Sequence, residues 1–331
     1  MVRGKSVLLV FSVIAGMLVF APAAAGAEEG TPRETGVAAS TELGVQISTM
    51  PELKLLAAQS FTLPFLRGSG PLSAGNNLKA AFTVELSPVS INGRGELTWT
   101  PIAFLQAVAG GMAGSGWNID LLGMNIYGIG INEPVGEPAG EPRQTEVRGS
   151  AFDGVVWRLW GGVALQFDLA ALVPGDWNHI LFRAYNEGRY GAYSRARGEE
   201  SWIFENDAGE NRNGWSWYAS YVIGYQMPRS PVLDTIAFMA EMEKNLYNTP
   251  GGDRWGEGLT RWIFSSLFNF RITPRFSATV AVQMRTLRNY GYSDLENENR
   301  VWYQDLELSG DNGKRRLLFY RAAAVLTYKL R

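Results

Sequence analysis

The feature that most constrains the fold of this chain is an alternation of apolar and polar residues that recurs along most of its length. In 261-RWIFSSLFNFRITPRFSATVAVQMR-285, apolar side chains occupy nearly every second position of two runs that meet at Thr273-Pro274. Successive side chains of a strand point to opposite faces, so each run predicts a strand with one apolar face. The pattern recurs in 37–49, 78–86, 91–99, 155–169, 215–227 and 318–330, and less cleanly in 102–112, 177–187 and 233–246. The chain is therefore predicted to be all-β.

The connections between these segments alternate between short and long. The short ones contain proline and lie at Thr100-Pro101, 173–176, 228–231 and Thr273-Pro274. The long polar ones cover approximately 114–150, 188–213, 247–257 and 291–313. In outer-membrane barrels the strands form an up-and-down meander with short periplasmic turns and longer outer loops. The sequence thus predicts an antiparallel up-and-down transmembrane β-barrel.

The number of strands depends on two prolines. If Met50-Pro51 and Ser87-Pro88 form turns, the barrel has about 12 strands, and if they are bulges in longer strands, it has 10. Proline lacks the N–H that a strand ladder needs, which favours turns and 12 strands. The glycine-rich segment 67–76 would then lie among the short periplasmic turns, which favours 10. We predict about 12 strands and keep 10 as the alternative.

The first 27 residues have the pattern of a secretory signal peptide. Arg3 and Lys5 are followed by the apolar run 7–20 and by the small residues Ala25-Gly26-Ala27. This order is that of a basic region, a hydrophobic region and a cleavage site. We therefore assign 1–27 to a signal peptide and 28–331 to a barrel domain, and expect an exported protein. Beyond residue 27 we expect no transmembrane helix, because no apolar run approaches 18 residues.

The apolar face has the height and extent of a surface that meets lipid. Ten residues at about 3.4 Å each, tilted by about 40°, rise about 25 Å, which is the height of the apolar band of outer-membrane barrels. The opposite face carries small residues and charges of both signs, as expected of a polar lumen. The candidate lumen-lining residues are Arg94, Glu96, Arg158, Asp168, Glu241, Glu243, Arg261, Arg271, Arg275, Arg285 and Arg321. A secreted soluble β-protein is the alternative.

Two functions remain open for such a barrel. Its lumen charges can line a narrow, weakly anion-preferring channel for small polar solutes, as in porins. Alternatively, carboxylates such as Glu241 and Glu243 can pair with the arginines, giving a non-conducting structural or surface-interaction barrel. The expected partners are outer-membrane lipid, the barrel-assembly machinery and small polar solutes. No nucleic acid is expected, because the formal net charge is -2.

Few residues suit enzyme chemistry or metal binding. The chain has no cysteine, and His179 is its one histidine. A lipid-cleaving enzyme would need a paired histidine and serine on the outer side, whereas His179 follows a predicted periplasmic turn. The glycine-rich segment 110–116 lacks the lysine of a phosphate-binding loop. We expect no enzyme, no cofactor and no metal site.

One stretch also resembles a known family. Residues 78–117 contain Glu85-Leu86-Ser87-Pro88-Val89, 99-WTPIAFL-105 and 114-GSGW-117. These pieces are similar to the N-terminal part of outer-membrane β-barrel proteins of treponemes and related spirochaetes. The resemblance implies a barrel in the outer membrane and supplies no catalytic residues. Separately, 133-EPVGEPAGEP-142 predicts an extended, mobile acidic loop on the surface.

Overall fold

The computed structural model describes residues 36–330, apart from several gaps. The gaps are 50–51, 71, 122–123, 136–143, 174, 176, 199, 206–210, 229, 247–259 and 289–314. The predicted signal peptide 1–27 lies outside the described residues. So do the predicted loops 247–257 and 291–313, and most of the acidic segment 133–142.

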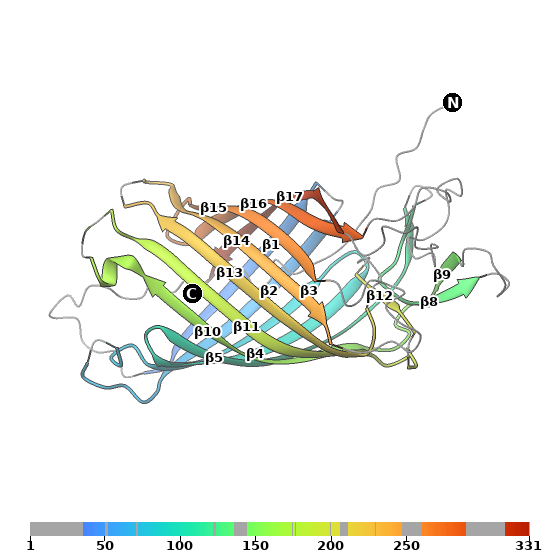
Figure 1. The fold of residues 1–331 in the computed structure, drawn as a ribbon, viewed down its shortest axis with the longest axis horizontal. Helices are drawn as coiled ribbons and strands as arrows, with labels where there is room; N and C mark the ends of the chain where they lie inside the picture. The colour runs from blue at the N-terminus through green and yellow to red at the C-terminus, as the bar shows by residue number, and fades with distance from the viewer. Residues whose placement is uncertain are drawn as a thin grey trace, which may run out of the picture.

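Twelve strands form one closed antiparallel barrel (Figure 1). They are β1 (Ala38–Ser48), β2 (Glu52–Pro64), β3 (Asn77–Leu86), β4 (Ser90–Ile102), β5 (Leu105–Gly116), β10 (Val156–Asp168), β11 (Ile180–Tyr193), β13 (Gly214–Gln226), β14 (Leu233–Asn245), β15 (Arg261–Arg271), β16 (Phe276–Arg288) and β17 (Arg315–Lys329). Each barrel strand pairs with the next, and β1 pairs with β17 from Glu42↔Lys329 to Ser48↔Ala323. The up-and-down barrel of 12 strands is confirmed.

The alternative of 10 strands is wrong, and Pro88 shows why. Residues 87–89 form a turn between β3 and β4, in which the Ser87 N–H donates to the Ser90 carbonyl at 2.9 Å. Pro88 therefore interrupts no ladder. The segment 65–76 is an elaborated turn at the opposite rim, where the Phe65 N–H donates to the Asn76 carbonyl at 3.2 Å.

The barrel has two unlike rims, named here by their connections. The turn end carries the connections at 65–76, 103–104, 169–179, 227–232 and 272–275, at the left of Figure 1. The loop end carries those at 49–51, 87–89, 117–155, 194–213, 246–260 and 289–314. The four longest connections all lie at the loop end, as the sequence predicts, but the short connections 49–51 and 87–89 lie there too, and the 12-residue connection 65–76 lies at the turn end.

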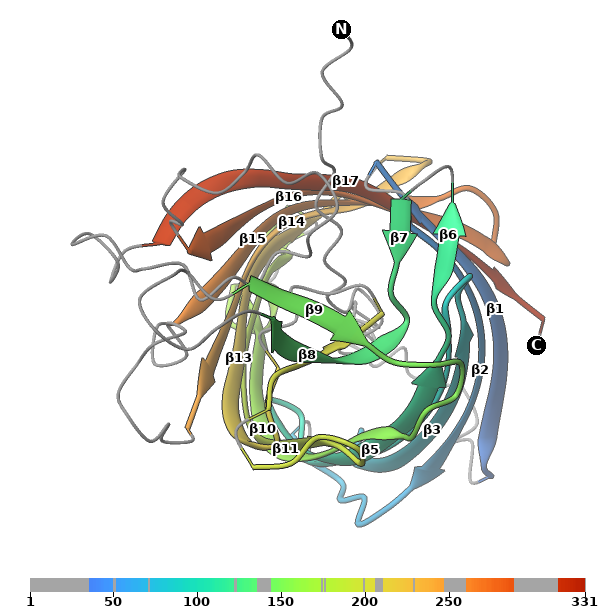
Figure 2. The same ribbon diagram turned by 90° about the vertical axis from the view of Figure 1, so that its right-hand side faces the viewer.

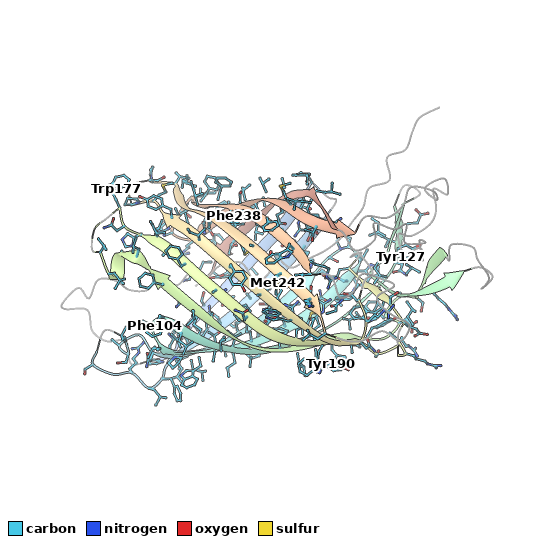
Figure 3. The ribbon with its side chains drawn as sticks, in the orientation of Figure 1. Phe104, Tyr127, Trp177, Tyr190, Phe238 and Met242 are labelled. Atoms are coloured by element: carbon cyan, nitrogen blue, oxygen red, sulfur yellow. The ribbon has the colours of Figure 1, made fainter. Side chains whose placement is uncertain are left out.

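The outer face of the barrel is apolar and exposed, whereas the inner face is polar and buried. On β10, Leu159 is 57% exposed and Leu165 is 55% exposed, while Ala164 between them is fully buried. On β16 and β17, the inward-facing Gln283 and Arg321 are 1% and 0% exposed. Figure 3 shows the side chains that cover the outside of the wall, among them Phe238. The inner face nevertheless contains an apolar patch made by Val222, Ala237, Met239, Leu267 and Ala281.

Aromatic side chains gather on the outer face near both rims. Towards the loop end, Tyr190 stacks on Trp157 and meets Trp215 edge-on, with 5.4 Å between ring centroids in each pair. At the turn end, Phe65 meets Trp99 at 6.5 Å. Rings at these levels match the interfacial girdles of outer-membrane barrels.

Two of the long connections at the loop end contain strands that the sequence analysis expects to be loop. Residues 117–155 form β6 (Ile119–Leu121), β7 (Met124–Ile126), β8 (Ile129–Val135) and β9 (Gln144–Arg148), and residues 194–213 contain β12 (Trp202–Phe204). β8 pairs with both β9 and β12, and this small sheet crosses the mouth of the barrel (Figure 2). The prediction of an extended loop is thus wrong for 133–135, because these residues pair with 144–146.

Candidate functional site

An apolar cluster seats the two long connections in the mouth. Ile129 of β8 and Trp202 and Phe204 of β12 pack against Val156 and Tyr193, at the loop-end edge of β10 and β11. All five are at most 3% exposed. Trp202 is held further by a hydrogen bond from its Nε1 to Asn213 Oδ1 at 3.0 Å. This packing therefore holds β12 and the start of β8 against the rim of the barrel.

Beyond this cluster, Glu205 carries the second connection across the mouth to the far wall. Lys54 on β2 donates from Nζ to Glu205 Oε2 at 2.7 Å and also approaches Glu85 Oε2 at 3.5 Å. Ser90 and Asn92 on β4 donate to Glu205 Oε1 at 2.7 and 2.5 Å. The strands β2 and β4 lie several strands away from β11 and β13, between which Glu205 is inserted. Glu205 thus fastens the connection to the opposite wall.

The backbone and charge of Glu205 both depend on this fastening. Its φ of 53° lies in the left-handed region, which costs a non-glycine residue about 1 kcal/mol and persists only where surroundings enforce it. Burial opposes ionisation of the carboxyl, but the Lys54 ammonium and the hydrogen bonds from Lys54, Ser90 and Asn92 outweigh it. Together they hold the pKa of Glu205 below its usual value. Glu205 is therefore an anion in the closed mouth.

A buried polar chain continues from the same level around the wall of β15, β16, β17, β1 and β2. Arg321 pairs with Glu52 and donates from Nε to Gln283 Oε1 at 2.7 Å. Gln283 in turn donates to Ser265 at 2.8 Å, and Gln46 donates to Glu52 at 2.5 Å. Arg285 lies over the Tyr320 ring at 4.4 Å. Arg321 and Arg285 are thus compensated inside the wall.

A second charged group lines the wall of β11, β13, β14 and β15. Arg189 contacts Glu187 at 2.5 Å and Glu243 at 3.8 Å, and Arg261 contacts Glu243 at 3.2 Å. Glu241 accepts a hydrogen bond from Tyr218 Oη at 2.6 Å. Arg158 of β10 is half-buried on the inner parity of its strand and lies beside Gly191. Glu243 therefore takes part in the pairing considered from the sequence, whereas Glu241 bonds to a tyrosine.

The wall of β4, β10 and β11 carries charges stacked on aromatic rings. Arg94 pairs with Glu96 at 2.5 Å, and its guanidinium lies 4.6 Å from the centroid of Trp160. Arg183 lies 5.1 Å from the centroid of Tyr185. Trp160 can reach over β5 because Gly110 has no side chain, and a Cβ there would come within 2.5 Å of the indole.

At the turn end, Arg271 and Arg275 are exposed, whereas Asp168 is buried. Arg271 pairs with Asp234, and its side chain is 63% exposed. Arg275 is exposed in the turn between β15 and β16. Asp168 caps the short 3-10 helix Leu169–Ala171 by accepting from the Ala170 N–H at 2.9 Å, and also contacts His179 Nδ1 at 2.9 Å. The histidine thus belongs to the packing of this rim.

The sequence analysis missed several residues of the lumen. It placed Arg189 in a loop, and it listed neither Lys54 nor Glu205 nor Trp160 as a candidate. One signal was available: 202-WIF-204 is an apolar run inside a polar connection, which indicates burial. Nothing local identifies Lys54, because its partner lies 151 residues away.

Two further observations concern the described part of the chain. None of its helices is long and apolar enough to cross a membrane. It also holds no group of three or more histidine, cysteine, aspartate or glutamate residues arranged to bind a metal ion.

Comparisons with known proteins give distant structural similarity. No family model matches the chain, and no curated protein matches it. Its structure is similar to a KdgM porin, with a TM-score of 0.35 and 9% identity over 88% of this chain and 99% of that one. It is also similar to the trimer form of OmpT, an outer membrane protein of Vibrio cholerae folded in vitro (TM-score 0.33, 7% identity, 89% and 99% covered). A mutant of the Rh. blastica porin gives a TM-score of 0.25 and 6% identity over 89% and 100%. These similarities are too distant to assign a function.

Proposed function

We propose that this protein is an integral outer-membrane barrel that forms a narrow channel for small polar solutes. The observation that carries the proposal is the contrast between an exposed apolar outer face and an inner face lined with charges. In water such an outer face would be unfavourable, since each Å² of apolar surface removed from water stabilises by about 25 cal/mol. A closed barrel also has no strand edge with unpaired backbone groups, and such groups would be costly in lipid.

The cleavable-signal pattern of residues 1–27 supports export, and the resemblance of 78–117 to treponemal barrels supports the same location. We further propose that the turn end faces the periplasm, following the rule that short turns lie inside. The loop end would then face outward, and its folded-in connections would make the outer mouth the narrowest part of the path. One observation supports the alternative of a non-conducting barrel. The hydrogen-bonded side chains from Ser265 to Glu52 are buried and fill part of the lumen.

Two experiments test the parts of this proposal separately. Insertion is tested by an arginine on each face of β16, where Val280 has the outer parity and Thr279 the inner one. An arginine on the lipid face near the bilayer centre costs about 2–4 kcal/mol, so Val280→Arg should impair folding into liposomes while Thr279→Arg should not. Equal tolerance would show that the outer face does not meet lipid.

Passage is tested by the swelling of liposomes that contain the folded barrel. Small sugars and amino acids should enter and swell the liposomes, while oligosaccharides of several residues should not, because the mouth is crossed by β8 and β12. Liposomes in which the barrel is shown to be folded by its heat-modifiable gel mobility, and which admit no solute, would establish the non-conducting alternative.

A further inference from the structure

The carboxylate of Glu205 is held by three donors that all belong to the opposite wall of the barrel. Its Oε1 accepts from Ser90 Oγ at 2.7 Å and from Asn92 Nδ2 at 2.5 Å. Its Oε2 accepts from Lys54 Nζ at 2.7 Å. Ser90 is 0% exposed, and Asn92 and Lys54 are each 5% exposed. Three buried donors on β2 and β4 thus converge on one carboxylate group.

The surroundings of this group favour a carboxylate anion. An ammonium and two neutral donors meet both of its oxygens, and hydrogen bonds that involve ionised groups are stronger than neutral ones. Burial raises the pKa of a carboxyl, but the Lys54 ammonium and the bonds from Ser90 and Asn92 hold the pKa of Glu205 below its usual value. This holds although Glu85 Oε2 also lies 3.5 Å from Lys54 Nζ. The three donors therefore have the chemistry of a carboxylate-binding site.

The residue that fills this site belongs to a connection and not to the wall. Glu205 directly follows β12 in the connection 194–213. Its φ of 53° is a conformation that a non-glycine residue keeps only where its surroundings enforce it. Lys54, Ser90 and Asn92, in contrast, lie on barrel strands. If the connection leaves the mouth, the donors stay on the wall while the carboxylate departs.

We propose that Lys54, Ser90 and Asn92 form a binding site for the carboxylate group of a solute, and that Glu205 fills this site in the closed mouth as an internal ligand. A carboxylate from solution competes with Glu205 for the same donors. The solute binds when the connection has opened, and a ligand shifts an equilibrium towards the state that it binds better. Carboxylate solutes therefore hold the mouth open. This inference rests on the proposed channel for its role, because it names a solute class, but binding at the site does not require conduction.

The site is tested first with its internal ligand removed. Glu205→Gly is suited to this, since glycine adopts a φ of 53° without strain and the side chain that is removed corresponds to propionate. Nitrogen–proton NMR of the folded barrel in detergent micelles follows the side-chain amides, and the Asn92 signal is identified by its absence in Asn92→Asp. Propionate is titrated at constant pH and ionic strength, with neutral propionamide as a parallel series. We expect the Asn92 signal to shift saturably with propionate only, and the signal of Asn178 at the turn end to stay unchanged.

Two further changes, each made in Glu205→Gly, show whether the donors act together. Lys54→Met removes a charge-assisted bond and should raise the half-saturating propionate concentration by about tenfold. Ser90→Ala removes a neutral bond and should raise it by a smaller factor, which tests the same point if Lys54→Met does not fold. The site is overturned if propionate does not shift the Asn92 signal, or if neither change alters the half-saturating concentration.

Displacement of Glu205 is tested in the wild type by the rate at which trypsin cleaves the folded barrel after Arg195 or Arg197. Propionate should accelerate this cleavage relative to propionamide at the same ionic strength, because a bound solute holds the connection 194–213 open. The activity of trypsin in the two solutions is compared on a free peptide. Propionate should not accelerate cleavage in Glu205→Gly, which has no internal ligand to displace. Equal rates in the two solutions for the wild type would overturn the displacement. If binding and displacement are both observed but the barrel does not conduct, only the proposed channel is overturned.

Discussion

The loop end and the turn end of this barrel are built from the same strands but are stabilised in opposite ways. At the loop end, Glu205 and Lys54 are buried and join opposite walls, and an apolar cluster around Trp202 fills part of the mouth. At the turn end, Arg271 and Asp234 pair at an exposed rim between neighbouring strands. The difference indicates that buried charge pairing joins opposite walls of the barrel at the loop end, whereas at the turn end the pair joins two neighbouring strands at an exposed rim.

The difference between the two ends is tested most strongly by removing one charge at each end. Glu205→Gln leaves Lys54 buried with a weakened partner, and disrupting a buried pair costs about 3 kcal/mol or more. We expect the 194–213 connection to open far more often, so that trypsin cleaves the folded barrel faster at Arg195 or Arg197. Asp234→Asn, the matched change at the turn end, should cost at most about 1 kcal/mol because its arginine is exposed. Equal cleavage rates in the two variants would contradict the proposed difference.

A second comparison uses glycines rather than charges. A Cβ at Gly128 would come within 2.0 Å of the Val89 carbonyl and 2.3 Å of the Trp117 carbonyl, so the start of β8 must shift. Overpacking of this kind costs about 1–3 kcal/mol. Gly75 at the turn end has nothing within 4 Å of the same position. Thermal unfolding should therefore show a clear loss of stability for Gly128→Ala and almost none for Gly75→Ala, and the reverse order would show that β8 is not seated as described.

The pH dependence of the mouth is expected to be a smaller effect under ordinary conditions. The pKa of Glu205 is lowered in the folded state, against the burial that would raise it. Ionised Glu205 therefore stabilises the closed mouth above the ordinary glutamate pKa of about 4.3, and this stability is lost as the pH falls through the lowered value. The protection factor of the Trp202 amide, which is its exchange rate corrected for the intrinsic effect of pH, should fall on acidification in the wild type but not in Glu205→Gln. If the two proteins showed the same pH dependence, Glu205 would not be the group whose protonation opens the mouth.

The smallest expected effect is that of Arg271→Gln. The Arg271 side chain is mostly exposed, so its pair with Asp234 contributes about 0–1 kcal/mol and is screened by salt. We expect unchanged folding and a slight change in ion selectivity at the turn end, measured as a reversal potential across a salt gradient. A large loss of stability would mean that this rim, too, depends on its charges.

The fold could be predicted from the sequence because alternation is a local signal. Leu159, Ala164 and Leu165 show their faces through their position in one strand, and prolines such as Pro88 mark where strands end. The folding of the loop end over the lumen could not be predicted in this way. Glu205 follows the first seven barrel strands in the chain, and it meets Lys54 of β2, which lies 151 residues earlier, only when the barrel has closed.

Some residues of the candidate site could likewise be predicted from the sequence, and others could not. Inward parity gave Arg94, Glu96 and Arg321 as candidates, because parity is set by the strand itself. It could not identify Trp160, whose inward position reads as one more apolar residue among Leu159 and Val163. Its role depends on Gly110 of the neighbouring strand, which leaves room for the ring. Contacts between strands thus decide which inward residues line the path and which are packed into the wall.

Single-channel recording in a planar bilayer tests the central claim most directly, namely that the polar lumen conducts and is restricted at the loop end. Wild type, Glu205→Gln and Arg271→Gln should be compared at neutral pH in the same salt, each after its folding has been verified by heat-modifiable mobility. We predict a small conductance for the wild type, a larger one for Glu205→Gln, and a value near that of the wild type for Arg271→Gln. A wild-type conductance that Glu205→Gln leaves unchanged, or the absence of conductance in all three proteins, would contradict this account.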